Sequence, residues 1–365
     1  MKLIFTCGGT GGHVSPAIGI AEYARSRYNM SDILFVGRTH GNENKAIKKR
    51  NFKIYEIDIS APKTKPISAA IKYAFKLISA IKVAKNILKE YKPDAVIGTG
   101  GYVSYPILYA ARRMNIPIYI HESNAYPGRV TRLMSKSAER VFLNIEDASR
   151  YFKNDKNVYL VGNPILSDFG KIKKSDARRH LKISENTSLI VSFGGSGGAE
   201  RINREMINVI SRCKNENKMV NIIHACGEKY FPTIKKEHPD LFRESDRFRI
   251  IPYIENMPEL LAAADLVISR SGAMSCTELA ASGAAAILIP SPNVKDNHQY
   301  KNAEYYSSKG AARLIEENEI SDDKLYNEIF TLLNNKTALI KMRSKIAKTY
   351  NSNAARDICE AIYQK

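Results

Sequence analysis

KLIFTCGGTGGHVSPAIGIAEYA, residues 2–24, decides the fold of the first half of the chain. A short apolar run leads into four glycines around one threonine, and apolar residues at helical spacing follow. Glycines let backbone N–H groups approach phosphate oxygens, and the start of a helix adds a favourable dipole. The stretch therefore predicts a strand, a loop and a helix that bind an anion. The alternative is a tight turn with a purely structural role.

Short runs rich in Ile, Val and Phe recur along the chain, with helical spacing between most of them. This alternation predicts parallel sheets covered by helices on both faces. The runs are 2–6, 32–37, 95–98, 116–121, 140–144, 188–195, 221–227, 248–254, 265–272 and 285–290.

The series of strands restarts after VGNPILSDFG (161–170), where Asn-Pro and Gly mark a turn. We therefore expect an α/β protein with two doubly wound, Rossmann-like domains. The first covers residues 1–163 and the second residues 164–339. Two such domains are expected to face each other across a cleft at the carboxyl ends of their strands.

Composition narrows the class of protein. The 365 residues carry a net charge of +19, which favours a polyanionic partner: nucleic acid, an anionic membrane surface or a phosphorylated substrate. The five cysteines are scattered, which argues against a disulfide framework and a zinc site and suits a reducing cytoplasm. No signal peptide, membrane span or nucleic-acid motif is recognisable. We expect a soluble, cytoplasmic protein that does not bind nucleic acid.

Two further glycine loops follow predicted strands, GTGGY (98–102) and GGSGG (194–198). The dinucleotide fingerprint G-x-G-x-x-G fits poorly, because Val14 and Glu200 stand where the third glycine belongs. No acidic residue ends the second predicted strand, where a nicotinamide enzyme binds its ribose. A nicotinamide cofactor is therefore not expected, and phosphate-bearing ligands are.

The stretch 264–290 is read as strand, turn, helix and strand. At the start of that helix the N–H groups of Ala273, Met274 and Ser275 are available to a phosphate. Glu278, about one turn further on, can accept hydrogen bonds from two ribose hydroxyls. The alternative is a carboxylate that complements the helix dipole.

The chain resembles the MurG family of bacterial UDP-N-acetylglucosamine transferases, which complete the lipid-linked disaccharide of peptidoglycan. The motifs that carry this resemblance occur in the family's order over most of the chain. They are GGTGGHVSPA (8–17), GTGGYVSYP (98–106), IPIYIHESNAYPG (116–128), VGNP (161–164), FGGSGGAERIN (193–203), RSGAMSCTELAASG (270–283) and KDNHQYKNA (295–303).

The resemblance implies the glycosyltransferase type B fold, with a C-terminal helix (340–365) that returns to the first domain. It also implies that the second domain binds UDP-GlcNAc. Ser196 and the N–H groups of Ala273, Met274 and Ser275 would hold the diphosphate. The backbone of Ile254 would contact uracil, Glu278 the ribose, and Gln299 the hydroxyls of GlcNAc. In the first domain, the residues near the transferred sugar or the acceptor would be Thr10, Gly11, Gly12 and Asn124.

The activity implied by the resemblance is transfer of GlcNAc, with inversion, to the muramic acid 4-hydroxyl of lipid I. The product is lipid II, made for peptidoglycan at the cytoplasmic face of the membrane. No clustered Asp-x-Asp is present to hold a cation, so neither a metal nor another cofactor is expected. The alternatives are a UDP-sugar 2-epimerase, a lipid glycosyltransferase with another acceptor, and a non-catalytic UDP-sugar binding protein.

His13 is the candidate catalytic base, because it follows the first glycine loop and imidazole has an ordinary pKa of about 6.5. The alternative is that it orients the loop or caps the helix. His121 and Glu122 are a second acid–base option, or buried support for Asn124.

The chain departs from the family pattern at three positions. His298 replaces the first residue of a Gln-Gln pair, and Gly197 stands where a glutamine often follows the serine. Leu166 stands where an arginine often follows GNP, so no role is assigned to it.

Eight lysines and one acid lie between residues 61 and 92. Ile67, Ile71, Phe75, Ile78 and Ile81 recur there at helical spacing. A basic amphipathic helix of this kind can lie on an anionic inner membrane surface. The alternative is a crossover helix that packs this stripe onto the sheet. Cell-wall synthesis proteins are left open as further partners.

Overall fold

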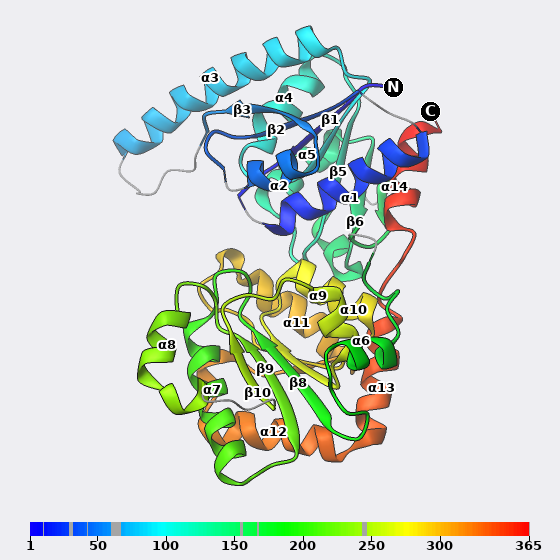
Figure 1. Ribbon diagram of the computed structural model, residues 1–365. Helices are drawn as coiled ribbons and strands as arrows, with labels where there is room; N and C mark the ends of the chain where they lie inside the picture. Colours follow the sequence, from blue (N-terminus) through cyan, green and yellow to red (C-terminus); the bar gives the residue numbers. More distant parts are fainter. Residues whose placement is uncertain are drawn as a thin grey trace. The chain divides into compact units, whose positions relative to one another are not determined.

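The computed structural model describes residues 1–9, 11–28, 32–41, 43–59, 67–153, 156–165, 168–242 and 247–364. The chain divides into two compact units (Figure 1). The first is Met1–Leu166 together with Asn351–Lys365, and the second is Ser167–Tyr350.

The described residues of the first unit form a seven-stranded parallel sheet, in the order β3-β2-β1-β4-β5-β6-β7. The chain reverses direction across the sheet between β1 and β4, the position at which ligands bind in such sheets. The strands are β1 (Leu3–Cys7), β2 (Ile33–Arg38), β3 (Lys53–Ile57), β4 (Ala95–Gly100), β5 (Ile118–Glu122), β6 (Arg140–Leu143) and β7 (Val158–Leu160).

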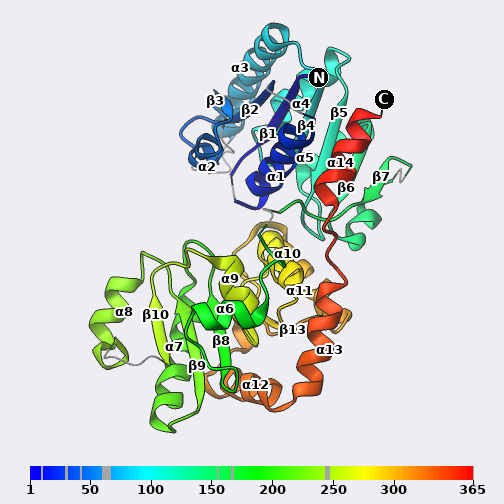
Figure 2. The same cartoon turned by 45° about the vertical axis from the view of Figure 1, so that its right-hand side comes forward.

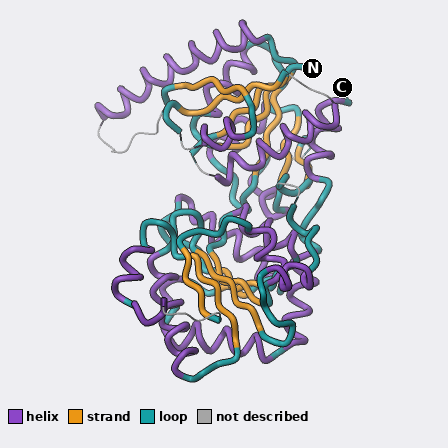
Figure 3. The backbone as a smooth tube through the Cα atoms, in the orientation of Figure 1, coloured by secondary structure: helices purple, strands orange, loops and turns teal. Residues whose placement is uncertain are grey.

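Helices cover both faces of this sheet, as Figure 3 shows. Leu3 and Phe5 of β1 pack toward the helices α1 and α14, whereas Ile4 packs toward α3 and α4. Because both faces are covered, every residue of β1 is buried. The α-helices of this unit are α1 (Gly11–Tyr28), α2 (Glu43–Lys49), α3 (Ile67–Tyr91), α4 (Ser104–Arg113), α5 (Arg129–Met134) and α14 (Ala354–Tyr363).

The part of the second unit that the structure describes repeats the plan with a six-stranded parallel sheet, in the order β10-β9-β8-β11-β12-β13. Its strand order reverses between β8 and β11. The strands are β8 (Ser188–Phe193), β9 (Val220–Ala225), β10 (Phe248–Ile251), β11 (Leu266–Ser269), β12 (Ala286–Leu288) and β13 (Arg313–Leu314). The α-helices are α6 (Lys174–His180), α7 (Glu200–Asn215), α8 (Phe231–Glu237), α9 (Met257–Ala263), α10 (Ala273–Ser282), α11 (His298–Ser308), α12 (Asp322–Asn334) and α13 (Lys336–Ala347).

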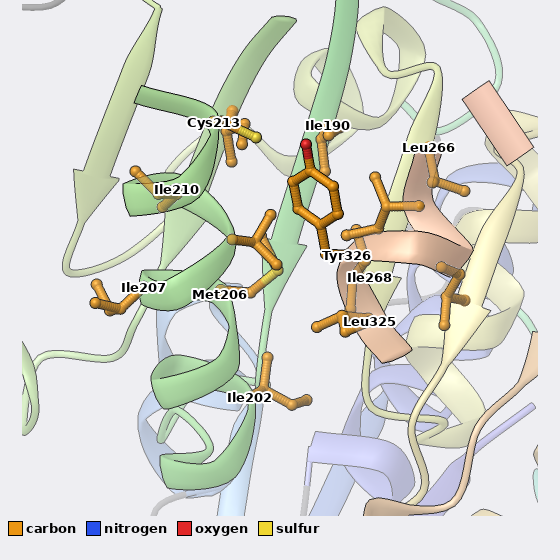
Figure 4. Packing of buried hydrophobic residues seen from close by; sticks show 14 of the residues in the cluster. Ile190, Ile202, Met206, Ile207, Ile210, Cys213, Leu266, Ile268, Leu325 and Tyr326 are labelled. Atoms are coloured by element: carbon orange, nitrogen blue, oxygen red, sulfur yellow. The ribbon is translucent and has the colours of Figure 1, made fainter. Parts of the chain in front are cut away.

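The core of the second unit lies between its sheet and the helices α7 and α12 (Figure 4). Ile202, Met206 and Ile210 recur every four residues along α7 and are fully buried. They belong to the same cluster as Ile190 and Ile268, which come from the two central strands. Burial of each such side chain contributes about 2 kcal/mol, which holds α7 and the loop that precedes it on the sheet.

The expected single helix over 340–365 is wrong. The segment forms two helices, α13 in the second unit and α14 in the first, and Figures 1 and 2 both show α14 beside α1. Between them the Asn351 amide donates to the carbonyl of Val161 at 2.9 Å and to Asp357 Oδ2 at 3.0 Å. These bonds compete with helix formation, as is typical of asparagine, so only residues after 350 return to the first unit.

Candidate functional site

The two glycine loops of the first unit meet at the reversal point of its sheet. The N–H of Gly8 donates to the carbonyl of Gly100 at 3.2 Å. A Cβ on Gly101, whose φ is +88°, would lie 2.1 Å from the carbonyl oxygen of Gly8. This close approach of two backbones requires glycine. Gly11 and Gly12 then open α1, while Thr10 lies outside the described residues.

His13 is the third residue of α1 and is half-buried. A Cβ on Gly100 would lie 2.4 Å from His13 Nδ1, so the imidazole lies against the backbone of the second glycine loop. The hydroxyl of Thr99 donates to the carbonyl of His13 at 2.5 Å. The second loop thus fixes both the backbone and the ring of His13.

Glu122 holds Asn124 in place, which is one of the two roles considered for it from the sequence. Its Oε1 accepts hydrogen bonds from the backbone N–H of Asn124 at 3.0 Å and from the amide of Asn124 at 3.2 Å. Its Oε2 accepts the N–H of Gly128 at 2.9 Å. The next side chain, Ser123, donates to the carbonyl of Gly12 at 3.4 Å. Half-buried Asn124 is therefore held beside the first glycine loop.

The surroundings of His121 are those of a residue with a structural role. It is fully buried, and its Nε2 lies 3.0 Å from the carbonyl oxygen of Gly162. Burial lowers the pKa of His121 because the charged imidazolium is poorly solvated there. The neutral ring links the end of β5 to the segment that leaves β7.

In the second unit, α10 begins directly after Gly272, which has extended backbone angles and no side chain to cap the helix. The N–H of Cys276 makes the first bond of the helix, to the carbonyl of Gly272 at 2.9 Å. The N–H groups of Ala273, Met274 and Ser275 precede that bond and point out of the helix end. N–H groups in this position are able to bind an anion.

Glu278 is the sixth residue of α10, one turn beyond this terminus, and it is half-buried. Burial raises the pKa of its carboxyl to about 7. The dipole of a helix acts mainly within the first turn, where α10 has no acidic residue. The alternative of a carboxylate complementing the dipole therefore has little support.

A pocket of about 560 Å³ lies next to the GGSGG loop in the second unit. Gln299, the first-turn residue of α11 expected to contact GlcNAc, lines it. The Oε1 atom of Gln299 accepts the N–H of Ser291 at 2.9 Å. The other lining residues are Gly194, Gly198, Ala199, Glu200, Arg201, Arg204, Tyr230, Arg270, Ser291, Asn293 and Glu317.

Two other residues expected at the donor site lie in loops of the second unit. Ser196 is exposed at the centre of the loop between β8 and α7. Ile254 is 6% exposed and follows β10. Both loops leave the carboxyl ends of strands, as ligand-binding loops do in this architecture.

The departures from the family pattern have distinct structural settings. His298 Nδ1 lies 2.7 Å from the carbonyl oxygen of Lys295, and it closes a turn in which Asp296 and Asn297 both have positive φ angles. Gly197 has open space where a Cβ would stand, so a larger residue fits there. Leu166 lies outside the described residues.

Sequence reasoning missed several polar residues that hold the site. Ser104 donates to the carbonyls of Thr6 and Gly100, which ties β1 to β4. Arg270 lines the pocket of the second unit and pairs with Glu317. The signal that could have found Arg270 is its position, since it directly follows β11 and directly precedes Ser271-Gly272.

Within the described ranges, no group of three or more His, Cys, Asp or Glu side chains is placed to hold a metal ion. The five cysteines are all buried, and none of them forms a disulfide bond. None of the helices that the structure describes is both long and apolar enough to span a bilayer.

Comparison with known proteins gives the family. The N-terminal domain of glycosyltransferase family 28 matches residues 3–143, and the C-terminal domain of that family matches residues 189–361. A relative from Acetivibrio thermocellus is 39% identical over 100% of this chain and 97% of its own. A relative from Thermoanaerobacter sp. is 40% identical over 99% of each chain. Both are named UDP-N-acetylglucosamine--N-acetylmuramyl-(pentapeptide) pyrophosphoryl-undecaprenol N-acetylglucosamine transferase.

The crystal structure of MurG from Acinetobacter baumannii superimposes with a TM-score of 0.79 at 27% identity, over 100% of this chain and 99% of that one. The chain belongs to the MurG family. The family's type B fold thus accounts for both parallel sheets, which confirms the expected fold class. A UDP-GlcNAc 2-epimerase from Neisseria meningitidis shares the fold with a TM-score of 0.66, but at 16% identity it shows no more than that.

Proposed function

We propose that the chain transfers GlcNAc from UDP-GlcNAc to lipid I, which produces lipid II for peptidoglycan. The observation that carries this proposal is the identity of about 40% to transferases of that name over the full length of the chain. The site residues described above are compatible with that chemistry in both units. The relation to the 2-epimerase is limited to the fold, so no observation favours isomerase chemistry.

On the donor side, negative charge grows on the departing diphosphate as the sugar bond breaks. Three N–H groups at the start of α10 are fixed there before the reaction begins, and they stabilise that charge without reorganisation. Ser196 adds a hydroxyl from the glycine loop between β8 and α7. Glu278 binds the ribose, the backbone of Ile254 binds uracil, and Gln299 binds hydroxyls of GlcNAc. The chain's own groups thus supply an electrostatic sink for the leaving group.

On the acceptor side, the muramic acid 4-hydroxyl must lose a proton as it attacks the anomeric carbon. His13 is assigned as the base, because the second glycine loop holds its ring at the start of α1. Gly11 and Gly12, which open α1, are assigned to the acceptor together with Thr10 and Asn124. Attack from the side opposite the diphosphate inverts the configuration at the anomeric carbon.

The test is UDP release from UDP-GlcNAc, measured with and without a short-chain lipid I analogue. Release that requires the acceptor supports the transferase, and release without an acceptor contradicts it. His13→Ala is expected to lower the rate by about a hundredfold or more, the usual contribution of a general base. His238→Ala is the matched control, because His238 is exposed in the second unit and has no assigned role.

Contact with the membrane is proposed for α3. Ile71, Phe75 and Ile78 are 54%, 70% and 65% exposed, so the stripe expected from the sequence does not pack onto the sheet there. Ile81 is half-buried, and the side chain of Ile67 lies outside the described part of the chain. The exposed side chains are apolar enough to enter the headgroup region of a bilayer. We therefore propose that the enzyme works at the cytoplasmic face of the membrane, where its lipid-linked acceptor would be found.

A further inference from the structure

The residues just before α10 are bonded to the helix that carries Gln299. The hydroxyl of Ser271 donates to the backbone carbonyl of Gln299 at 2.8 Å. The amide of Asn302, one turn further along α11, donates to the carbonyl of Ser271 at 3.0 Å. Ser271 and Asn302 are both fully buried. Buried polar bonds of this kind hold the two segments in one arrangement, because a broken bond leaves a polar group unsolvated.

Arg270 adds a second connection between the same two regions. Its Nη1 donates to the carbonyls of Ile289 and Pro290, each at 3.2 Å, at the end of β12. Its guanidinium also pairs with Glu317, and both side chains are largely buried. The loop that follows Pro290 leads to α11, so its starting point is fixed relative to α10.

These contacts decide how Gln299 can bind a ligand. Its carbonyl is held by Ser271, and its side-chain oxygen accepts the N–H of Ser291. The amide NH₂ of Gln299 is then the part that can donate to an oxygen of a sugar in the pocket. A shift of α11 by a fraction of an ångström relative to α10 would misplace that donor while the phosphate-binding N–H groups remained intact.

We propose that Ser271 is a positioning residue for recognition of the donor sugar, and that it acts through Gln299. The proposal rests on the proposed function, since it assigns the diphosphate to α10 and GlcNAc to Gln299. In this assignment, UDP contacts the start of α10 but not Gln299, whereas UDP-GlcNAc contacts both. The connection made by Ser271 therefore contributes to the difference in affinity between UDP-GlcNAc and UDP.

The test is calorimetric binding of UDP and of UDP-GlcNAc to the full-length protein. Ser271→Ala is expected to weaken UDP-GlcNAc binding by about tenfold, roughly the value of one hydrogen bond, and to change UDP binding by less than about twofold. Ser308→Ala is the matched control: its hydroxyl donates to the carbonyl of Tyr305 at 3.0 Å at the other end of α11. That variant is expected to bind both ligands as the wild type does.

The double variant Ser271→Ala/Gln299→Ala tests whether Ser271 acts through Gln299. In the Gln299→Ala background, Ser271→Ala is expected to have no further effect on UDP-GlcNAc binding. The proposal would be overturned if Ser271→Ala kept its full effect on affinity in that background. It would also be overturned if Ser271→Ala alone weakened the binding of UDP and UDP-GlcNAc equally, or weakened neither. A wild type that binds UDP but not UDP-GlcNAc would instead refute the proposed function.

Glu317→Gln provides a second variant should Ser271→Ala fail to fold. It removes the charge partner of Arg270 at nearly constant volume, and the same selective loss of UDP-GlcNAc binding is expected. Glu319→Gln is its control, because Glu319 lies in the same short helix (Glu317–Glu319) and pairs with Lys324 at the surface. If Glu317→Gln and Glu319→Gln had the same affinities for UDP-GlcNAc and for UDP, that result would contradict the proposal.

Discussion

Glu278 shows how much one residue's environment can add to a motif. Its position in the sequence suggested either a ribose ligand or a partner of the helix dipole. In the structure it lies beyond the first turn of α10, and burial raises its pKa to about 7. A carboxyl group of this kind is poorly solvated, so two hydroxyl donors from a ligand would compensate for lost water.

The first prediction concerns the pH dependence of donor binding. The ionised carboxylate accepts hydrogen bonds from two hydroxyls, and the protonated form is a weaker acceptor. Affinity for UDP-GlcNAc is therefore expected to increase as pH rises through 7, by about tenfold between roughly pH 6 and pH 8. Both phosphates of this ligand are esterified, so its own charge is constant over that range. Calorimetry at several pH values measures the effect.

Glu278→Gln is the control for this prediction, and its affinity should be lower and independent of pH. Folding stability has the opposite dependence on pH. Between the ordinary carboxyl pKa of 4.5 and about 7, the folded state binds more protons at Glu278 than the unfolded state does. The contribution of Glu278 to stability therefore falls as pH rises across that window. A donor affinity that falls with rising pH would contradict the assigned role.

The second prediction compares two neighbouring glycines in the GGSGG loop. Gly198 has a φ of +74°, and a Cβ there would lie 2.2 Å from the carbonyl oxygen of Cys226. Gly198→Ala is therefore expected to destabilise the second unit by about 3 kcal/mol in urea unfolding. At Gly197 the space is open, and Gly197→Ala should change stability by less than about 0.5 kcal/mol. If both substitutions lowered the free energy of unfolding equally, the loop would not be held as described.

At the scale of a single element, α3 has two apolar faces and they have different roles. The inward face packs into the core of the first unit through Ala80, Ala84, Ile87 and Leu88. The outward face is apolar in its first half and basic in its second, where Lys82, Lys85 and Lys89 are exposed. These lysines continue the line of Ile78 at helical spacing. The helix thus presents an apolar and a cationic patch on one side, as membrane-surface helices do.

The third prediction is that α3 governs binding to lipid vesicles. Phe75→Ser/Ile78→Ser is expected to lower binding to vesicles containing anionic phosphatidylglycerol by about tenfold, because two inserted apolar side chains are lost. UDP-GlcNAc binding should be unchanged. Met219→Ser/Ile340→Ser is the control, since both residues are also 66% or more exposed but belong to the second unit. Co-sedimentation measures binding, and unaltered sedimentation of the α3 variant would refute the proposed membrane contact.

At the scale of the whole molecule, the last residues of the chain complete the first unit. Ile358 and Ile362 of α14 are buried in the same cluster as Ile20 and Ala24 of α1. Met1–Leu166 therefore lacks part of its core until residues synthesised nearly two hundred positions later have packed. The second unit, by contrast, is continuous in sequence.

The fourth prediction follows from this arrangement. Ile358→Ala removes a fully buried side chain and is expected to destabilise the first unit by about 3 kcal/mol. Hydrogen exchange should then accelerate at β1 and α1, while β8 and β11 keep their protection. Ile340→Ala on α13 is the control, because that side chain is 66% exposed. Equal acceleration in both units would show that they unfold together.

The sequence alone predicted ten strands, and all ten are confirmed. Among the described residues it missed three strands, β3, β7 and β13, and all three are at sheet edges. Inner strands have two covered faces and give continuous apolar runs, so local sequence reveals them. β3 is partly exposed, and β7 and β13 span only three and two residues, so they give no long apolar run; β7 also exposes Leu160 at 60%. The positions of the glycine loops were also predictable, because several glycines between a strand and a helix are typical of a loop with unusual backbone angles or close backbone contacts.

Other features depended on contacts between distant parts of the chain. Periodicity identified an apolar stripe on α3, but only packing decided that a different stripe faces the core. The break before α14 depends on a bond from Asn351 to Val161, 190 residues away. The contact of Ser271 with Gln299 joins residues 28 positions apart. Local sequence determined the elements and the loops between them, because propensity and periodicity act over one or two turns. Only the tertiary structure decided which faces are covered and which side chains hold the site, because those depend on partners brought close by folding.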